Sequence, residues 1–185
     1  MTQDRLDKGF LFSITSVDPI VVAGLKTTTP KSVEDLKGKR VAVAKGTTAI
    51  KALAELNKKG YSITVIQAND YTEGFMMVDQ GRADFVGANE LLLGGNIGIM
   101  VPEQSNKFKV YSNVVIGDPE LVGVMFKKGD KELEDIIRST VQNMKNDGSL
   151  DKLYEKWFVG PIAPHDNKLN LPRTKEKRNL VWSNN

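Results

Sequence analysis

Arg40-Val-Ala-Val-Ala-Lys-Gly-Thr-Thr48 is the stretch of sequence that decides the fold. Its first half is short, apolar and partly β-branched, which predicts a buried strand. Lys45-Gly-Thr-Thr48 then predicts a tight turn, and residues 47–59 place apolar side chains at helical spacing before Gly60 ends the helix. A strand that leads through a short turn into an amphipathic helix is the unit of an α/β fold with a parallel sheet.

The same pattern repeats downstream of this stretch. Residues 61–66 and 83–87 are predicted strands, and residues 71–80 between them are a predicted helix that ends at Gly81. Asn89 begins one more helix. Strands that alternate with helices imply parallel pairing with right-handed crossovers, so we expect a parallel-rich sheet.

The flanking segments follow a different pattern. Strands are predicted at residues 10–14 and 19–25, and again at residues 107–116 and 120–126, with a turn at residues 117–119 between the last two. A short helical turn is predicted at residues 32–38. Two helices follow at residues 130–146 and from Ser149 onward. From Gly160 the chain is rich in Pro, Asn and Lys, which favours an extended tail.

Composition narrows the class of protein. The 185 residues are 40% hydrophobic and 26% charged, as in a globular domain or in one lobe plus part of another. There are no cysteines, which excludes disulfides and thiolate chemistry. The formal net charge is +3, with the densest basic cluster at Arg173, Lys175, Lys177 and Arg178. We expect a solvated chain end there, and no nucleic-acid binding, because aromatic residues are not interleaved.

The turn at Gly46, Thr47 and Thr48 is the first candidate binding site. It exposes backbone N–H groups at the positive end of a helix dipole, and a carboxylate or phosphate suits such a position. In open α/β sheets, ligands sit beyond the carboxyl ends of the strands, where this turn lies. The alternative is that Gly-Thr-Thr only caps the helix.

Tyr71, Asn89 and Glu90 follow neighbouring strands and fall at the same edge of the sheet. Asn89 or Glu90 could face a ligand there. The alternative is that Asn89 caps the next helix and Glu90 is its first-turn acid. Tyr71 is a third candidate, and its alternative role is that of a packed aromatic residue.

Residues for catalysis are scarce. The single histidine, His165, lies in the tail, and the sequence has no nucleophile elbow, P-loop, dinucleotide fingerprint or histidine-containing metal spacing. We therefore expect no catalytic residue, no metal and no cofactor.

Several longer segments occur in a familiar order. They are Ser32-Val-Glu-Asp-Leu-Lys-Gly-Lys-Arg-Val-Ala-Val-Ala-Lys-Gly-Thr-Thr48, Gly81-Arg-Ala-Asp-Phe-Val86, Val124-Met-Phe-Lys-Lys-Gly-Asp-Lys-Glu-Leu133 and Asn146-Asp-Gly-Ser-Leu-Asp-Lys-Leu-Tyr-Glu-Lys-Trp-Phe158. Together they resemble the periplasmic amino-acid-binding proteins of bacterial ABC transporters, solute-binding protein family 3. Gly160-Pro-Ile-Ala-Pro164 and Leu169-Asn-Leu-Pro172 resemble the glutamate/aspartate-binding branch.

The resemblance implies a type II periplasmic-binding-protein-like fold, in which two α/β lobes are joined by two crossing strands. Residues 1–26 would hold a remnant of the first lobe and the first crossing strand, and residues 27–115 a complete second lobe. Residues 116–159 would hold the second crossing strand and helices that return to the first lobe, and residues 160–185 the extended tail. The first lobe is then largely missing, so we expect an N-terminally truncated member.

The resemblance also assigns roles to residues. In the family, the equivalents of Gly46, Thr47 and Thr48 hydrogen-bond the ligand carboxylate, and the acid that pairs with the ligand ammonium falls at Asn89. Glu90 would replace that acid only if the loop shifts. Tyr71 stands where the acidic-amino-acid branch has a histidine. Arg5 is the nearest match to the first-lobe arginine that binds the α-carboxylate.

The function that this resemblance implies is the substrate-binding component of an amino-acid ABC transporter, with a polar or acidic amino acid as ligand and the membrane permease as partner. We expect a monomer that binds weakly or not at all without its first lobe. The family is periplasmic, but residues 1–5 carry no signal peptide, so the chain as written would stay cytoplasmic. The alternatives are a cyclohexadienyl or arogenate dehydratase on the same scaffold, with Glu90 as its acid, and a severed sensory module.

Overall fold

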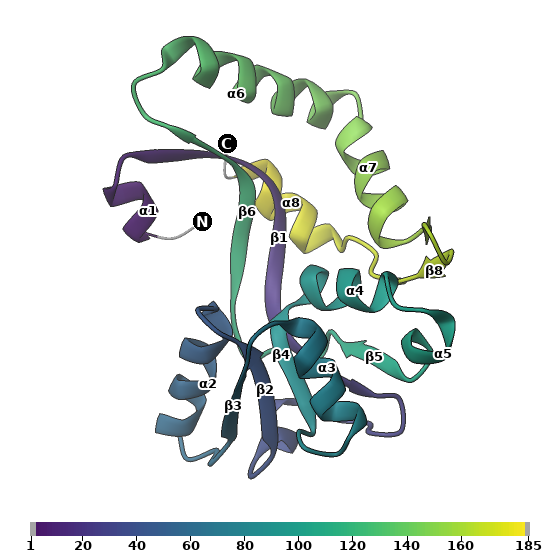
Figure 1. The fold of residues 1–185 in the computed structure, drawn as a ribbon. Coiled ribbons are helices and arrows are strands. Elements are labelled where there is room, and N and C mark those ends of the chain that lie inside the picture. The colour runs from purple at the N-terminus through teal and green to yellow at the C-terminus, as the bar shows by residue number, and fades with distance from the viewer. Residues whose placement is uncertain (1–2, 184–185) are drawn as a thin grey trace.

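Residues 40–48 lie at the centre of the fold, as their pattern predicts. In the computed structural model, which describes residues 3–183, β2 (Arg40–Ala44) leads through the turn at Gly46 into α2 (Thr48–Lys58). The unit repeats as β3 (Thr64–Ala68), α3 (Tyr71–Asp79), β4 (Phe85–Asn89) and α4 (Glu90–Gly98). Strands β3 and β4 flank β2 in parallel, which confirms the predicted parallel pairing (Figure 1).

The complete sheet is mixed in direction. Its strand order is β3-β2-β4-β1-β5, and β6 pairs with β1 beyond this path. Strand β1 (Phe10–Leu25) runs antiparallel to β4, to β5 (Phe108–Tyr111) and to β6 (Gly117–Lys127). The α/β class is therefore confirmed, with parallel pairing confined to the three strands of the repeating units.

Two apolar layers cover the two faces of this sheet. Because side chains alternate along a strand, Val41 and Val43 pack with Leu53 of α2 on one face, and Ala42 packs with Phe75 of α3 on the other. All of these side chains are buried. The short helix η1 (Val33–Leu36) and its buried Leu36 close the first layer, and α4 completes the second.

Strands β1 and β6 form a long ribbon that leaves the lobe (Figure 1). The prediction of separate strands at residues 10–14 and 19–25 is wrong, because β1 is continuous through them. The predicted turn at residues 117–119 is also wrong, since Gly117 already pairs with Ile20. Pro19 and Pro119 both fall at an irregularity between the pairs Asp18/Glu120 and Ile20/Gly117. A bulge tolerates proline, so the two prolines bend the ribbon without ending it.

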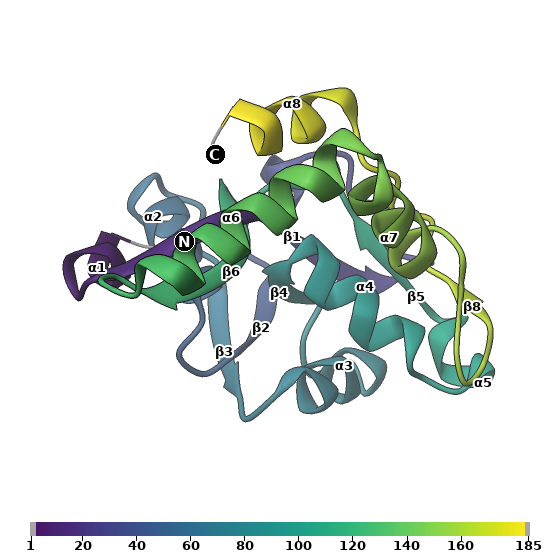
Figure 2. The ribbon, with the colours of Figure 1, turned by 90° about the horizontal axis from the view of Figure 1, so that it is seen from above.

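Helices gather at the far end of the ribbon. Helix α6 (Lys131–Asn146) packs on it, α7 (Ser149–Phe158) follows α6 beside the ribbon, and α1 (Gln3–Asp7) precedes β1 (Figure 2). Ser149 is the first residue of α7, and Gly148 in the left-handed conformation precedes it as the N-cap. The short helix α5 (Pro102–Ser105) connects α4 to β5.

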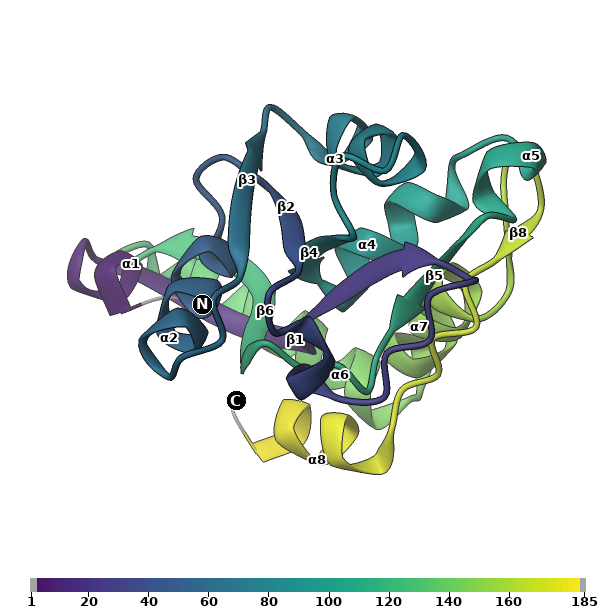
Figure 3. The same ribbon diagram turned by 90° about the horizontal axis from the view of Figure 1, so that it is seen from below.

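The extended tail predicted from residue 160 is structured. It holds a two-stranded hairpin, β7 (Pro161–Ile162) and β8 (Asn167–Lys168), followed by helix α8 (Lys175–Ser183), which packs against β1 (Figure 3). The Thr174 hydroxyl accepts a hydrogen bond from the amide of Lys177 and caps α8. Val181 of α8 is fully buried with Phe12 and Ile14 of β1 and Leu150 of α7. This apolar contact holds helix α8 against β1, although the composition of the tail favours an extended chain.

Within residues 3–183, the structure contains no helix that is both long and apolar enough to cross a membrane.

Candidate functional site

The turn between β2 and α2 is open to solvent. Gly46 has φ +73, a conformation that favours glycine, and a Cβ added there would meet no atom within 4 Å. Thr47 is the N-cap of α2, but its hydroxyl donates to the carbonyl of Ala44 at 2.8 Å. No residue in the described part of the chain accepts a hydrogen bond from the amides of Gly46, Thr47 or Thr48. The turn therefore presents unused donors at the positive end of a helix.

Thr48 and Asn89 meet at one carboxylate, that of Glu120. The Nδ2 of Asn89 donates to Oε2 of Glu120 at 2.8 Å, and the Thr48 hydroxyl donates to the same oxygen at 3.3 Å. All three side chains are half-buried. The carboxyl ends of β2 and β4 thus converge on a residue of β6, at the point where the ribbon leaves the lobe.

Asp18 and Tyr71 complete what we call the strand-end cluster: Asp18, Thr48, Tyr71, Asn89 and Glu120. Asp18 is buried, its Oδ1 accepts from the Leu91 amide at 3.0 Å, and its backbone carbonyl accepts from Asn89 at 3.3 Å. Burial raises the pKa of Asp18 to about 7, and the charges of Glu90 and Glu120 add to the shift. Burial also raises the pKa of Tyr71, with smaller contributions from Asp18 and Glu120.

Glu90 points elsewhere. It is the first residue of α4, it is 3% exposed, and its carboxylate forms an ion pair with the ammonium of Lys177 in α8. Asn89 is the N-cap of α4, but its side chain bonds Asp18 and Glu120 and makes no cap hydrogen bond. The two neighbouring residues therefore have different surroundings.

Arg5 is not brought into the strand-end cluster. It is exposed on α1, ahead of the first residue of β1, whereas Asp18 lies halfway along that strand. A strand rises about 3.3 Å per residue, so the start of β1 lies on the order of 25 Å from Asp18. Figure 1 shows α1 at the end of the ribbon away from β2 and β4.

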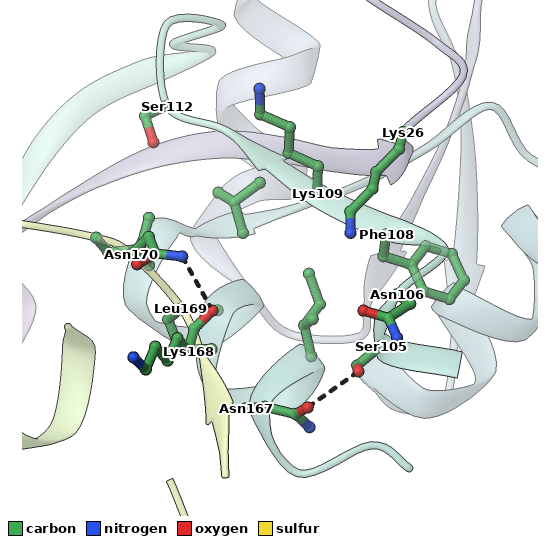
Figure 4. A pocket seen from close by; sticks show the side chains of 14 residues that line it. Lys26, Ser105, Asn106, Phe108, Lys109, Ser112, Asn167, Lys168, Leu169 and Asn170 are labelled. Atoms are coloured by element: carbon green, nitrogen blue, oxygen red, sulfur yellow. Dashed lines mark hydrogen bonds between the residues drawn. The ribbon is translucent and has the colours of Figure 1, made fainter. Parts of the chain in front are cut away.

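Two cavities bear on the choice of site. An open groove of about 630 Å³ runs between α2 and β6, and both Thr48 and Glu120 line it. A second cavity, of about 400 Å³, lies between β5 and the tail, with Lys26, Ser112 and Asn170 in its wall (Figure 4). This second cavity shares no lining residue with the strand-end cluster, and its polar groups are not joined to the turn at Gly46. Geometry therefore favours the strand-end cluster.

Asp18 and Glu120 were missed by reasoning from the sequence. They pair across the ribbon, and this pairing depends on the irregularity beside Pro19 and Pro119. The signal that was available is chemical: Asp18 is the one charged residue among residues 10–25, and Glu120 directly precedes the apolar run of residues 121–126.

The structure thus combines a mixed α/β sheet, a long two-stranded ribbon and an open turn at the strand ends. The family model for bacterial extracellular solute-binding proteins, family 3, matches residues 20–160. The chain therefore belongs to this family.

The names of individual relatives are consistent with this family. The L-glutamate/L-aspartate-binding protein of Pseudomonas aeruginosa is 34% identical over 162 residues, which cover 85% of this chain and 51% of that protein. The chain thus spans about half the length of this relative. The structure of a probable amino-acid ABC transporter extracellular-binding protein from Bacillus subtilis matches with a TM-score of 0.71 and 25% identity, over 85% of this chain and 67% of that one.

A third match concerns the alternative of a dehydratase on the same scaffold. An ancestral amino-acid-binding protein, described as a precursor of cyclohexadienyl dehydratase, matches with a TM-score of 0.64 and 28% identity, over 85% of this chain and 64% of that one.

Proposed function

We propose that this chain is the ligand-binding part of a substrate-binding component of an amino-acid ABC transporter. The observation that carries the proposal is the set of unused amide donors at Gly46, Thr47 and Thr48, beside Asn89 and Glu120. A helix N-terminus with free donors suits a carboxylate, and every amino acid carries one. The strand-end cluster supplies carboxylates for the ammonium. A polar or acidic amino acid fits the names of the relatives.

The proposed division of the chain follows its contacts. Residues 27–115 form the second lobe, and the C-terminal half of β1 supplies strand pairs to its sheet. The ribbon of β1 and β6 is the pair of crossing strands, and α6 and α7 belong with the first lobe, of which these 185 residues hold only part. The partner of the loaded protein is the membrane permease, and the site of action is the periplasm.

An isolated lobe offers only part of a ligand's contacts. We expect a monomer with a dissociation constant of about 1 to 10 mM, which corresponds to roughly 3–4 kcal/mol of binding free energy. Closure of two lobes would desolvate the ligand and strengthen each polar contact. A micromolar dissociation constant for these 185 residues would contradict the expectation that a single lobe binds weakly.

We also propose that the chain is not an enzyme. A dehydratase would need an acid that can reach the substrate, and Glu90 is the candidate. Its carboxylate is buried and paired with Lys177, which leaves it poorly placed to donate a proton to a ligand. Unchanged concentrations of prephenate and arogenate after prolonged incubation would support binding, whereas turnover that Glu90→Gln abolishes would support the enzyme.

The test of the proposed function is a titration followed by two-dimensional ¹H–¹⁵N NMR. Each common amino acid is added to the 185-residue chain up to tens of millimolar. We expect saturable shifts at the amides of Gly46, Thr47, Thr48 and Asn89 with at least one amino acid. Saturable shifts confined to the cavity beside β5, or none with any amino acid, would overturn the proposal.

A further inference from the structure

The carboxylate of Glu120 is held in a fixed position at the strand-end cluster. We propose that Glu120 is the acidic partner of the ligand's ammonium group, and so a determinant of specificity for free amino acids. This inference rests on the proposed function, and it names the residue that supplies the negative charge. Neither the match to the family nor the names of the relatives assign a role to this residue.

The need for such a residue follows from Asn89. The ammonium of a free amino acid calls for a negative partner at the strand ends, and the side chain of Asn89 is neutral. Its side chain ends 2.8 Å from Oε2 of Glu120, so the carboxylate lies immediately beyond the end of the Asn89 side chain. The negative charge that position 89 lacks is therefore present beside it, delivered from the crossing strand β6.

Glu120 is also oriented for this task. Asn89 and Thr48 both donate to Oε2, while Oε1 accepts no hydrogen bond from any residue that the structure describes. The side chain is half-buried and lines the groove between α2 and β6. A carboxylate held through one oxygen, with the other free, binds a cation with little further loss of side-chain freedom. Charge-assisted hydrogen bonds of this kind are roughly twice as strong as neutral ones.

The two neighbouring acids are less suitable. Glu90 is paired with Lys177. Asp18 is 4% exposed, and its Oδ1 already accepts from the amide of Leu91. Glu120 is thus the acid of this group that combines partial exposure with an unused oxygen.

The same geometry has a second interpretation, in which Glu120 stands in for a ligand's carboxylate and competes with it for Thr48 and Asn89. The two interpretations predict opposite effects of neutralising Glu120. Loss of affinity for a ligand that carries an ammonium supports the proposal, and a gain of affinity supports competition.

The experiment compares ligands that differ only in the ammonium, so that no bulk is added. The probes are L-glutamate with glutarate, and L-arginine with 5-guanidinopentanoate, titrated into the full chain by NMR. We expect the wild-type chain to bind the free amino acid of at least one pair at least tenfold more tightly than its deaminated analogue. Glu120→Gln should lose that preference and leave the analogue's affinity within about twofold.

Two further variants control the result. Asp118→Asn removes an exposed charge two positions earlier on the same strand, and it should keep the preference. The double variant Glu120→Gln/Asn89→Asp returns a carboxylate to the site from β4 and should restore it. Equal binding of both members of each pair, or tighter binding by Glu120→Gln, would overturn the role of Glu120 while leaving the proposed function standing. No saturable binding of any probe, with no response to the other amino acids, would overturn the proposed function and this inference with it.

Discussion

The ammonium of Lys177 lies against the carboxylate of Glu90, although the two residues are 87 positions apart in the sequence. The side chain of Glu90 is 4% exposed and that of Lys177 is 19% exposed, so most of this ion pair is shielded from water. It joins the C-terminal helix α8 to the first turn of α4, next to Asn89. The predicted chain end is therefore part of the structure that surrounds the candidate site.

Lys177→Met is expected to destabilise the protein by about 3 kcal/mol. Removing one partner of a buried ion pair leaves the other charge desolvated and uncompensated, which typically costs 3–5 kcal/mol. The double variant Lys177→Met/Glu90→Gln removes both charges and should recover most of the loss. Urea unfolding measures both effects, and Lys175→Met, at an exposed position of the same helix, should change stability by less than about 0.5 kcal/mol. A loss in the double variant as large as in the single one would contradict the pairing.

Stability is expected to fall as the pH rises from about 4 to about 7, because of Asp18. The pKa of this carboxyl is raised from 3.8 to about 7 in the folded protein by burial, with Glu90 and Glu120 adding to the shift and Lys177 opposing it. In that window the folded state keeps a proton that the unfolded state has released, so stability decreases with pH. At about 1.4 kcal/mol per pH unit, the loss has an upper bound of roughly 4 kcal/mol.

Asp18→Asn tests the origin of this pH dependence. Asparagine keeps an oxygen that can accept from the amide of Leu91 and carries no charge at any pH. Unfolding at pH 5 and pH 8 should show a clear difference in the wild-type chain and little difference in the variant. The variant should also be the more stable of the two at pH 8. If both proteins gain stability between pH 5 and pH 8, the raised pKa of Asp18 is wrong.

Val181→Ala is expected to cost about 2 kcal/mol. Val181 is fully buried against Phe12, Ile14 and Leu150, and burial of a valine side chain contributes roughly 1.5–3 kcal/mol. Leu180→Ala at the adjacent position, where the side chain is 41% exposed, is the matched control and should cost markedly less. Equal losses in thermal and urea unfolding would mean that α8 does not dock on β1 through this residue.

Gly123→Ala is expected to disrupt the ribbon. A Cβ at this position would lie 2.1 Å from the carbonyl oxygen of Ser13 on the paired strand. Backbone atoms cannot yield as a flexible side chain can, so β1 and β6 would have to separate locally. We expect a loss of more than about 2 kcal/mol. Gly95→Ala, where a Cβ would meet no atom within 4 Å, is the control and should be tolerated. Unchanged stability of Gly123→Ala would contradict the pairing of Ser13 with Val124 and its neighbours.

The part of the fold that could be predicted is the part set by local pattern. Residues 40–98 alternate short apolar strands with amphipathic helices, and most helix boundaries follow from Gly60, Gly81 and the capping residues. The ribbon could not be predicted in the same way, because Pro19 and Pro119 look like strand breakers unless they fall at a bulge. Helix α8 was missed because its stability comes from Val181 and Lys177, whose partners are distant in sequence.

The residues of the candidate site were likewise predictable only in part. Thr48, Tyr71 and Asn89 could be anticipated at one sheet edge, because the carboxyl ends of parallel strands meet there. The cluster that they form with Glu120 could not, since it depends on how β6 pairs with β1. The sequence also could not decide between Asn89 and Glu90 as candidates. The two side chains differ in their partners, and only the structure shows those partners.

The central claim is that the amides at the start of α2 hold the carboxylate of an amino acid. Thr48→Pro tests it most directly, because proline is tolerated at the first position of a helix and removes the N–H donor. Lys131→Pro, at the first position of α6, is the matched control. Calorimetric titration with the amino acid that binds most tightly should show at least a tenfold weaker affinity for Thr48→Pro, with helix content and the affinity of the control unchanged. Equal affinity of Thr48→Pro and the wild-type chain would contradict the account.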